Sequence, residues 1–270
     1  MRLFVLFLLC LPVWVNADVY QWRDASGGRH FSDQFRAEAT PLAIKPTGAF
    51  YKVAKVYDGD TVLLADGRKI RLLGINTPEV SHFGKATEAG GEEAKHWLTD
   101  ALAGRKVRLE LGVERTDKYG RTLAHLFTDT KEHVNLQLVK RGLASVSIYP
   151  PNLGYAAALV TAEQEAERGR LGVWGRPEYA PIGADKLTAA GHSGWTRVIG
   201  KVVAVRHAKR MVILEFANSF TARIERRWSD LFPDLDSYRG KTVEVRGWLS
   251  HSQQHLSMLL RHPSAVKLLP

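Results

Sequence analysis

The stretch "DGDTVLLADGRKIRLLGINTPE", residues 58–79, decides the fold that this chain predicts. Two runs rich in apolar residues, 61–64 and 69–75, flank the turn signal Ala-Asp-Gly-Arg at 65–68, a pattern that predicts a β-hairpin. Acidic residues stand before the first strand, and an amide, a hydroxyl, a proline and a carboxylate follow the second. The stretch therefore predicts a hairpin with a reactive polar edge.

Outward from this hairpin, the middle of the chain alternates short strands with helices. Residues 50–56, 106–111 and 121–127 read as three more strands, and residues 134–141 and 156–168 as helices. Another helix precedes Gly104, which stops it; its apolar face is formed by Ala94, Trp97, Leu98, Ala101 and Leu102. Five short strands with inserted helices predict a small barrel of the OB type with three helices.

The C-terminal part, from about residue 195, also alternates strands with turns and predicts a second, smaller OB-like β-barrel. The predicted fold class is therefore mainly β with α (α+β). Residues 195–270 hold 13 Lys and Arg against 6 Asp and Glu. The rings of Phe220, Trp228 and Trp248 either stack on bases beside these charges or lie in the core, and both readings stay open. The basic cluster comprises Arg206, Lys209, Arg210, Arg226 and Arg227.

The composition limits the class of protein. The 270 residues are 45% hydrophobic with a formal net charge of +10, so the chain can bury a core and is not globally disordered. Such an excess of positive charge favours polyanionic partners, either nucleic acid or an anionic envelope surface. A merely soluble basic protein is the alternative.

The N-terminus predicts an export signal. Arg2 precedes an apolar stretch at 3–15 that is too short for a stable membrane anchor, and Val-Asn-Ala at 15–17 fits a cleavage site before Asp18. The only cysteine, Cys10, lies inside this segment. We expect an exported protein, periplasmic or secreted, with no stable membrane insertion after cleavage of the signal.

Residues 19–34, "VYQWRDASGGRHFSDQ", predict a small hairpin around the turn at 24–28. The pattern resembles a short domain of unknown function found behind signal peptides in bacterial envelope proteins, which implies a possible envelope contact through residues 18–47. Residues 35–47 read as a linker. The predicted organisation is a signal peptide (1–17), the hairpin domain and linker (18–47), a barrel domain (48–180), a second linker (181–194) and the basic domain (195–270).

The polar residues of the middle domain suit phosphodiester hydrolysis. Asp58 and Asp60 offer oxygen ligands of the kind that a hard cation such as Ca²⁺ prefers. Arg71 and Arg121 begin predicted strands, and a guanidinium group can bind two phosphate oxygens at once. Glu79 follows a proline that stiffens its turn, so its carboxylate could take a proton from a water molecule as a general base.

Four patches stand in series here: "YDGDTV" (57–62), "RLLGINTPE" (71–79), "TDKYGRTLAHL" (116–126) and "NLQLVKRGLASV" (135–146). In this order and spacing they closely resemble the staphylococcal nuclease family, the thermonucleases. The resemblance extends to "GEEAKHWL" at 91–98 and to "GVW" at 172–174. Any single patch is a weak signal, whereas the series is specific.

The resemblance implies a Ca²⁺ site. Asp60 matches the family's carboxylate ligand, Thr77 matches a residue that binds through its backbone carbonyl, and Asp58 matches an acid of the outer shell. Asn76 stands where the family has a second aspartate ligand. Because an amide brings no charge, we expect Ca²⁺ to bind more weakly by about one to two orders of magnitude.

The resemblance also implies roles around the substrate. Arg71 and Arg121 match the arginines that clamp the phosphate, and Glu79 matches the catalytic glutamate. Three residues match positions that contact a bound nucleotide: Lys118, Tyr119 and Tyr149. A second tyrosine expected two positions before Tyr149 is Ser147 here, so stacking on the nucleotide is expected to differ.

The leading prediction is thus an exported Ca²⁺-dependent nuclease that hydrolyses DNA and RNA with low sequence specificity. The alternatives are a catalytically weak nucleic-acid-binding protein and an envelope interaction protein. Other residues receive structural readings. His82, His96, His125 and His133 have no metal-ligand spacing and are read as surface or packing residues, and Trp97 and Trp174 as core.

Overall fold

The computed structural model describes residues 19–24, 28–32, 40–42, 49–81, 86–188, 191–217, 220–252 and 255–270. The chain divides into two compact units, Met1–Gly48 and Ala49–Pro270. The predicted signal peptide, Cys10 and His82 lie outside the described residues. No helix in the described part of the chain combines the length and the apolar character that a membrane crossing requires.

The N-terminal unit contains a three-stranded antiparallel sheet. Strands β1 (Val19–Arg23) and β2 (Arg29–Ser32) form the predicted hairpin, and Asp24 accepts a hydrogen bond from the Gly28 amide at 2.9 Å. Strand β3 (Thr40–Leu42) pairs with the other edge of β1. The prediction of a linker at 35–47 is therefore wrong at these three residues. Pro41 obscured the strand, because a proline is tolerated only at the edge of a sheet.

The first barrel is closed by five strands in the order β4-β5-β6-β9-β8. Neighbours pair antiparallel except β6 and β9, which run parallel. The five predicted strands are confirmed, although β4 and β8 run past the predicted ends. The strands are β4 (Phe50–Asp58), β5 (Thr61–Leu64), β6 (Lys69–Leu72), β8 (Lys106–Thr116) and β9 (Thr122–Thr128).

The return strand predicted over residues 69–75 is interrupted. Strand β6 ends at Leu72, and β7 (Ile75–Asn76) pairs instead with β10 (Ser145–Val146). Gly74 lies between them at φ +76°, and a Cβ there would stand 2.5 Å from Leu159. Only glycine adopts this conformation readily, so the chain turns out of the barrel at the point where the polar edge begins.

Three helices pack on the first barrel, as predicted. They are α1 (Gly91–Leu102), α2 (Val134–Lys140) and α3 (Ala156–Arg168). Leu98 and Leu102 of α1 share one hydrophobic core with the strands, and so do Leu138 of α2 and Leu159 of α3. Two 3-10 turns follow α3, η1 (Gly172–Gly175) and η2 (Pro177–Tyr179), and a third, η3 (Ala184–Lys186), comes after β11 (Ile182–Gly183).

The C-terminal sheet repeats the connectivity of the first barrel. Five strands pair in the order β12-β13-β14-β16-β15, and β15 pairs again with β12. We call these five strands, with the described segments that connect them and the residues that follow β16, the C-terminal ring. Here too the third and fifth strands, β14 and β16, run parallel. The elements are β12 (Trp195–His207), β13 (Met211–Phe216), β14 (Phe220–Glu225), η4 (Arg226–Leu231), η5 (Leu235–Tyr238), β15 (Thr242–Ser252), β16 (His255–Leu260), η6 (Pro263–Ala265) and β17 (Val266–Leu268).

Of the three aromatic side chains expected either to stack on bases or to lie in the core, the structure decides the position of one. Phe220 is fully buried in the core of the C-terminal ring, so it lies in the core and cannot stack on a base. Trp248 is 39% exposed, and Trp228 is half-buried with the Arg227 guanidinium 5.3 Å from its ring. The mixed α+β fold class is confirmed.

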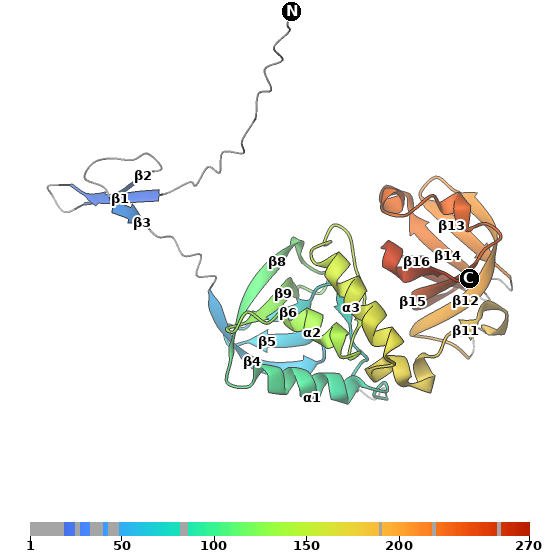
Figure 1. The fold of residues 1–270 in the computed structure, drawn as a ribbon, viewed down its shortest axis with the longest axis horizontal. Helices are drawn as coiled ribbons and strands as arrows, with labels where there is room; N and C mark the ends of the chain where they lie inside the picture. The colour runs from blue at the N-terminus through green and yellow to red at the C-terminus, as the bar shows by residue number, and fades with distance from the viewer. Residues whose placement is uncertain are drawn as a thin grey trace, which may run out of the picture. The chain divides into compact units, whose positions relative to one another are not determined.

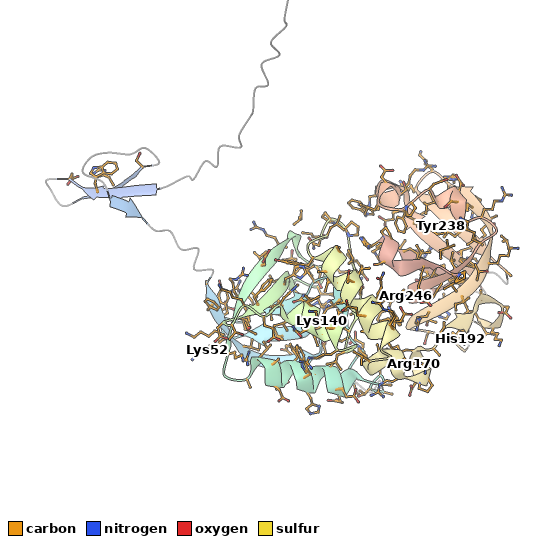
Figure 2. All side chains as sticks on the ribbon, viewed as in Figure 1. Lys52, Lys140, Arg170, His192, Tyr238 and Arg246 are labelled. Carbon is orange, nitrogen blue, oxygen red and sulfur yellow. The ribbon has the colours of Figure 1, made fainter. Side chains whose placement is uncertain are left out.

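Helix α3 lies beside the C-terminal ring (Figure 1), and a buried network of charges that includes Arg246, labelled in Figure 2, joins the two. Arg246 of β15 pairs with Glu163 at 3.1 Å and with Glu244 at 2.6 Å. Arg197 of β12 pairs with Glu167 of α3 and with Glu244. Because these side chains are removed from water and paired, breaking one pair is expected to destabilise the junction.

Candidate active site

The Asp-Gly-Asp turn between β4 and β5 is packed tightly against its surroundings. A Cβ at Gly59 would lie 2.6 Å from that of Ala94 on α1 and 2.7 Å from a methyl carbon of Thr77. Asp58 accepts a hydrogen bond from the Asp60 amide at 3.0 Å, which tightens the turn. Glycine is thus required for the turn to approach α1 and Thr77.

Asp60 lies at the corner where β5, β6 and β7 meet. Its side chain is buried, and Oδ2 lies 3.0 Å from the Arg71 guanidinium and accepts a hydrogen bond from the Thr77 amide at 3.0 Å. Arg71 also donates to the carbonyl oxygens of Leu72 (2.7 Å) and Ile75 (3.0 Å). Several donors of Arg71 are therefore used to fix its own position at the reactive edge.

Asn76 and Thr77 follow directly. In the structure, the Asn76 amide donates to the Thr77 carbonyl at 3.2 Å, and its oxygen faces Arg71 at 3.4 Å. The Ser145 hydroxyl donates to the Asn76 carbonyl at 3.2 Å. The side-chain nitrogen of Asn76 thus faces the Thr77 carbonyl, where the carboxylate of an aspartate would present an oxygen. The side-chain oxygen of Asn76 could bind a cation together with the Thr77 carbonyl only after the amide group rotates.

The donor set of this corner fits a hard cation. Burial raises the pKa of Asp58 to about 6, and the negative charge of Asp60 adds to the shift. A cation near the two carboxylates would relieve this cost. No group of three or more His, Cys, Asp or Glu side chains among the described residues is arranged to hold a metal, but an amide and a backbone carbonyl lie outside that set of ligands. Asp60, Asn76 and Thr77 supply only oxygen ligands, as Ca²⁺ prefers.

Glu79 lies at the exposed side of the same corner. Its amide donates to Glu88 at 2.9 Å, and its carbonyl accepts from the Glu88 amide at 2.9 Å, which fixes the backbone. Partial removal of the carboxyl from water raises its pKa, as does the charge of Asp60, while Arg71 and Arg121 act in the opposite direction. The positive charges of Arg71 and Arg121 therefore both act on the carboxyl group of Glu79.

Arg121 is held by a short loop after β8. Asp117 accepts hydrogen bonds from the Arg121 Nε at 2.7 Å and from its amide at 2.9 Å. Partial burial opposes a fall in the pKa of Asp117, but the hydrogen bonds from Arg121 outweigh it, and the pKa lies below its usual range. The two terminal guanidinium nitrogens form no hydrogen bond with any residue that the structure describes, so they can bind an anion.

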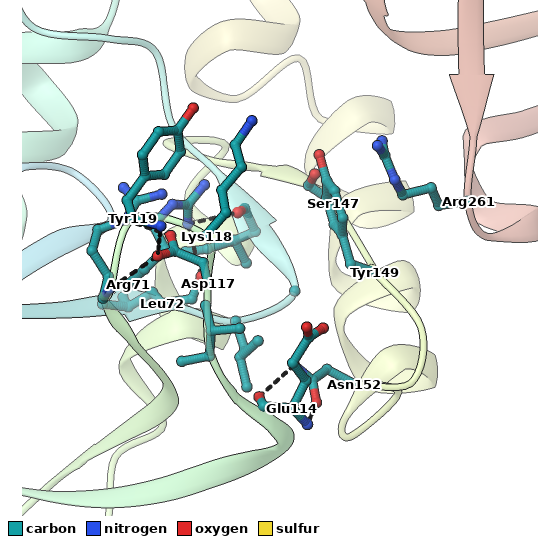
Figure 3. Close-up of a pocket in the computed structure, with 15 residues that line it drawn as sticks. Arg71, Leu72, Glu114, Asp117, Lys118, Tyr119, Ser147, Tyr149, Asn152 and Arg261 are labelled. Carbon is teal, nitrogen blue, oxygen red and sulfur yellow. Dashed lines mark hydrogen bonds and ion pairs between the residues drawn. The ribbon is translucent and has the colours of Figure 1, made fainter.

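One cavity of about 460 Å³ gathers most of the predicted substrate contacts (Figure 3). Arg71, Arg121, Lys118, Tyr119 and Tyr149 all line it. The predicted acids do not: Asp58, Asp60 and Glu79 are absent from its lining, and the ion pair of Asp60 with Arg71 connects them to it. The structure thus places the predicted phosphate-binding and nucleotide-binding residues in the cavity, together with Glu114 and Asp117, and leaves the predicted acids Asp58, Asp60 and Glu79 outside its lining.

Comparison with known proteins identifies the family. The protein-family model described as "Staphylococcal nuclease homologue" matches residues 69–176, and the family model of a domain of unknown function, DUF4124, matches residues 6–52. The thermonuclease of Staphylococcus intermedius is 38% identical over 172 residues, which cover 63% of this chain and 96% of that protein. The chain belongs to the staphylococcal nuclease family. It is accordingly a nuclease that hydrolyses phosphodiester bonds.

Two further relatives support this membership. The thermonuclease of Staphylococcus hyicus is 36% identical over 127 residues, 46% of this chain and 75% of that protein. The endonuclease YncB of Bacillus subtilis is 35% identical over 130 residues, 46% of this chain and 61% of that protein. The matched family region ends at residue 176, before the C-terminal ring begins.

Sequence reasoning missed two residues at the nuclease cavity. Asp117, which orients Arg121, lies inside a quoted motif, and its spacing of four from Arg121 was the available signal. Arg261 lines the cavity from the C-terminal ring and stands over Tyr149, with 4.5 Å from its guanidinium carbon to the ring centroid. No local pattern could have shown a contact between residues so far apart in the chain.

The histidines are confirmed as surface or packing residues where the structure describes them. His96 is exposed, whereas His125 is buried and lies 3.1 Å from His133 between their ring nitrogens. Burial lowers the pKa of each to about 4. Trp174 is buried as predicted, but Trp97 is only half-buried, beneath Arg141.

Proposed function

We propose that this nuclease requires Ca²⁺ and cleaves DNA and RNA with low sequence specificity, with Glu79 as general base and Arg71 and Arg121 as the phosphate clamp. The observation that carries the proposal is the electrostatic setting of Glu79. Its carboxylate has a raised pKa beside Asp60 and feels the positive charge of both arginines. An activated base beside two anion-binding groups suits attack by water on a phosphodiester.

Each of these side chains has a separate task. A carboxylate with a raised pKa is a stronger base than an ordinary glutamate, so Glu79 can accept a proton from the attacking water. The two terminal guanidinium nitrogens of Arg121, unbonded among the described residues, can bind the phosphoryl oxygens, while Asp117 keeps the group in place. Arg71 is fixed by Asp60, by Asn76 and by two carbonyl oxygens, so its position need not change when a phosphate binds beside it.

The metal would be held by Asp60, by the Thr77 carbonyl and by Asn76 once its amide oxygen faces Thr77, with Asp58 in the outer shell. When bound, Ca²⁺ supplies positive charge that stabilises negative charge on the phosphoryl oxygens. The uncharged amide of Asn76 lowers the ligand charge of the site, so a raised Ca²⁺ requirement follows. Lys118, Tyr119 and Tyr149 would contact the nucleotides next to the scissile phosphate.

The test is cleavage of single-stranded DNA by the purified protein over a titration of Ca²⁺, with EGTA as the control. Activity at millimolar Ca²⁺ that is abolished by EGTA is expected, and Glu79→Gln should lower it by about two to four orders of magnitude. An absence of cleavage at millimolar Ca²⁺, or undiminished cleavage by Glu79→Gln, would refute the proposal.

A catalytically weak nucleic-acid-binding protein is the second candidate. The basic cluster on the C-terminal ring favours it, since Lys209, Arg210, Arg226 and Arg227 line one open cavity. This reading predicts tight binding of nucleic acid with cleavage that does not depend on Glu79. The same assay therefore separates the two candidates.

We further propose that the protein is exported and that its C-terminal ring is an OB-like domain. The predicted signal at 1–17 and the match to DUF4124 support export of the protein. An envelope contact through residues 18–47 would be tested by attaching this segment to an unrelated carrier protein. Retention of no envelope component by that fusion would count against the contact.

A further inference from the structure

A second cavity adjoins the nuclease cavity. It measures about 270 Å³ and shares three lining residues with the first: Ser147, Tyr149 and Arg261. Its other walls include Trp195, Trp248 and Arg223 of the C-terminal ring. We call the two cavities together the junction groove. The groove runs from the phosphate-binding arginines to the face of β14, β15 and β16.

The junction groove is positively charged on the side of the C-terminal ring. Within the described ranges, no Asp or Glu lines the second cavity. Arg246 also lines it but is neutralised by its buried glutamates. Arg223 and Arg261 form no ion pair within the part of the chain that the structure describes, and the Nε of Arg223 is buried there without a hydrogen-bond partner. Two unneutralised guanidinium groups thus face the groove, which suits a polyanion.

Planar groups accompany these charges. Tyr149 is 44% exposed and Trp248 is 39% exposed. The guanidinium of Arg261 lies over the ring of Tyr149 (Figure 3). A guanidinium plane can stack on a base as an aromatic ring does, so Arg261 offers a planar surface beside Tyr149. Ser147, where the family resemblance led us to expect a second tyrosine, leaves that space open.

The acidic groups of the groove lie in the nuclease cavity. They are Glu114 and Asp117, and Asp117 is already paired with Arg121. His262, in the second cavity, has a pKa lowered by burial and adds little charge at neutral pH. Among the described residues that line the two cavities, the acidic side chains are therefore confined to the nuclease cavity.

We infer that the C-terminal ring completes the substrate site of the nuclease: the junction groove binds a single-stranded segment that flanks the scissile phosphate. Arg223 and Arg261 hold the backbone phosphates, and Tyr149 and Trp248 stack on unpaired bases. Single strands fit best because their bases are free to stack on aromatic side chains. The inference rests on the proposed function and specifies its substrate class.

The junction groove is distinct from the basic cluster at the turns of the C-terminal ring. Lys209, Arg210, Arg226 and Arg227 line a different cavity that shares no residue with the junction groove. Arg227 is moreover paired with Glu225 at 2.6 Å. Binding at that cluster would not place a strand next to Arg71 and Arg121.

The test measures binding without cleavage. The full chain carrying Glu79→Gln, in EGTA, is titrated against a fluorescein-labelled dT 12-mer, and anisotropy gives Kd over a range of salt. Arg261→Gln and Arg223→Gln should each raise Kd by about three- to tenfold. Each should also reduce the slope of log Kd against log salt by about 0.7, the value for one phosphate contact on a single strand.

The matched control is Arg239→Gln, which removes the same charge from an exposed residue of the ring outside both cavities. Its Kd and salt slope should stay at those of the parent. Arg261→Lys keeps the charge but loses the plane, so its salt slope should be retained while Kd still rises. Thermal unfolding of each variant checks that its fold is unchanged.

Equal Kd values for Arg261→Gln, Arg223→Gln and Arg239→Gln would overturn the inference. If the unaltered protein still cleaves in Ca²⁺, that result leaves the proposed nuclease function standing. A protein that binds the 12-mer through the groove but never cleaves it would refute the proposed function and leave the groove in place. Tighter binding of a blunt duplex than of the single strand, lost in Arg261→Gln, would also overturn the assignment to single strands.

Discussion

The first barrel and the C-terminal ring connect their strands in the same order, yet the turn between their first two strands carries opposite charge. In the first barrel this turn contains Asp58 and Asp60. In the C-terminal ring the corresponding turn contains Lys209 and Arg210. Because the connectivity is shared, the fold alone does not determine the chemistry. A few turn residues give the first barrel an acidic corner suited to a cation and the C-terminal ring a basic surface suited to phosphate.

Arginines on the third strands sharpen the contrast. Arg71 of β6 lies beside Leu123 of the parallel fifth strand, and Arg223 of β14 lies beside Leu259. Arg71 is fixed by Asp60 and by two carbonyls, whereas Arg223 forms no ion pair with any residue that the structure describes. The proposed phosphate clamp needs an arginine in a fixed position, while the inferred contact with the nucleic-acid backbone needs only an accessible one.

The largest expected effect breaks the junction between the two regions. Arg246→Met leaves Glu163 buried without its Arg246 partner and leaves Glu244 with Arg197 alone, so the free energy of unfolding should fall by about 3–5 kcal/mol. Urea unfolding measures this change. Arg206→Met, which removes an exposed pair with Glu215, is the control and should cost less than about 1 kcal/mol. Equal losses would show that the buried network does not hold the regions together.

The next effect removes one arginine of the proposed phosphate clamp from the first barrel. Arg121→Gln should lower kcat by about two to three orders of magnitude, as expected when one donor to the developing charge is lost. Steady-state cleavage of single-stranded DNA measures this, and Arg115→Gln on the exposed end of β8 is the control. If the two variants were equally active, Arg121 would have no role in the reaction.

A smaller effect restores an acid to the corner. Asn76→Asp adds a charged ligand, so the Ca²⁺ concentration for half-maximal binding should fall by about ten- to a hundredfold. Isothermal titration calorimetry measures the affinity directly. Gln164→Glu adds the same charge on the exposed face of α3 and should leave the affinity unchanged. An unaltered affinity in Asn76→Asp would contradict the charge argument.

The smallest effect concerns the pH dependence of the first barrel. The pKa values of His125 and His133 are lowered from 6.5 to about 4, so the unfolded chain binds more protons between those values. Stability is therefore lost as pH falls through this window. His125→Gln should reduce the loss between pH 7 and pH 4.5 by about 1–2 kcal/mol, after an allowance for solvent screening. Urea unfolding at both pH values tests this, and the same loss in variant and parent would exclude the histidine pair as its source.

Local patterns predicted much of the first barrel. The hairpin at residues 61–72, the apolar face around Leu98 and the helix at Ala156–Arg168 all follow from spacing within one segment. The interruption at Gly74 was missed because it depends on the contact with Leu159, which lies far along the chain. Strand β3 was missed because three residues that include a proline carry almost no strand signal.

The candidate site divides in the same way. The motifs predicted which residues of the first barrel lie at the reactive corner, since each motif follows or precedes a strand end. They could not predict that Arg261 reaches Tyr149 or that Glu163 pairs with Arg246. Such contacts depend on how the C-terminal ring packs on α3, and that packing has no signature within either segment.

The most direct test of the two proposed roles, cleavage by the first barrel and strand binding by the C-terminal ring, compares Glu79→Gln with Arg261→Gln on one labelled dT 12-mer. Single-turnover cleavage in Ca²⁺ at saturating protein gives the rate constant, and anisotropy in EGTA gives Kd. The account predicts that Glu79→Gln lowers the rate constant by about two to four orders of magnitude with Kd unchanged. It predicts that Arg261→Gln raises Kd by about three- to tenfold with the saturated rate constant unchanged. Undiminished cleavage by Glu79→Gln, or a slower saturated rate with an unaltered Kd in Arg261→Gln, would contradict it.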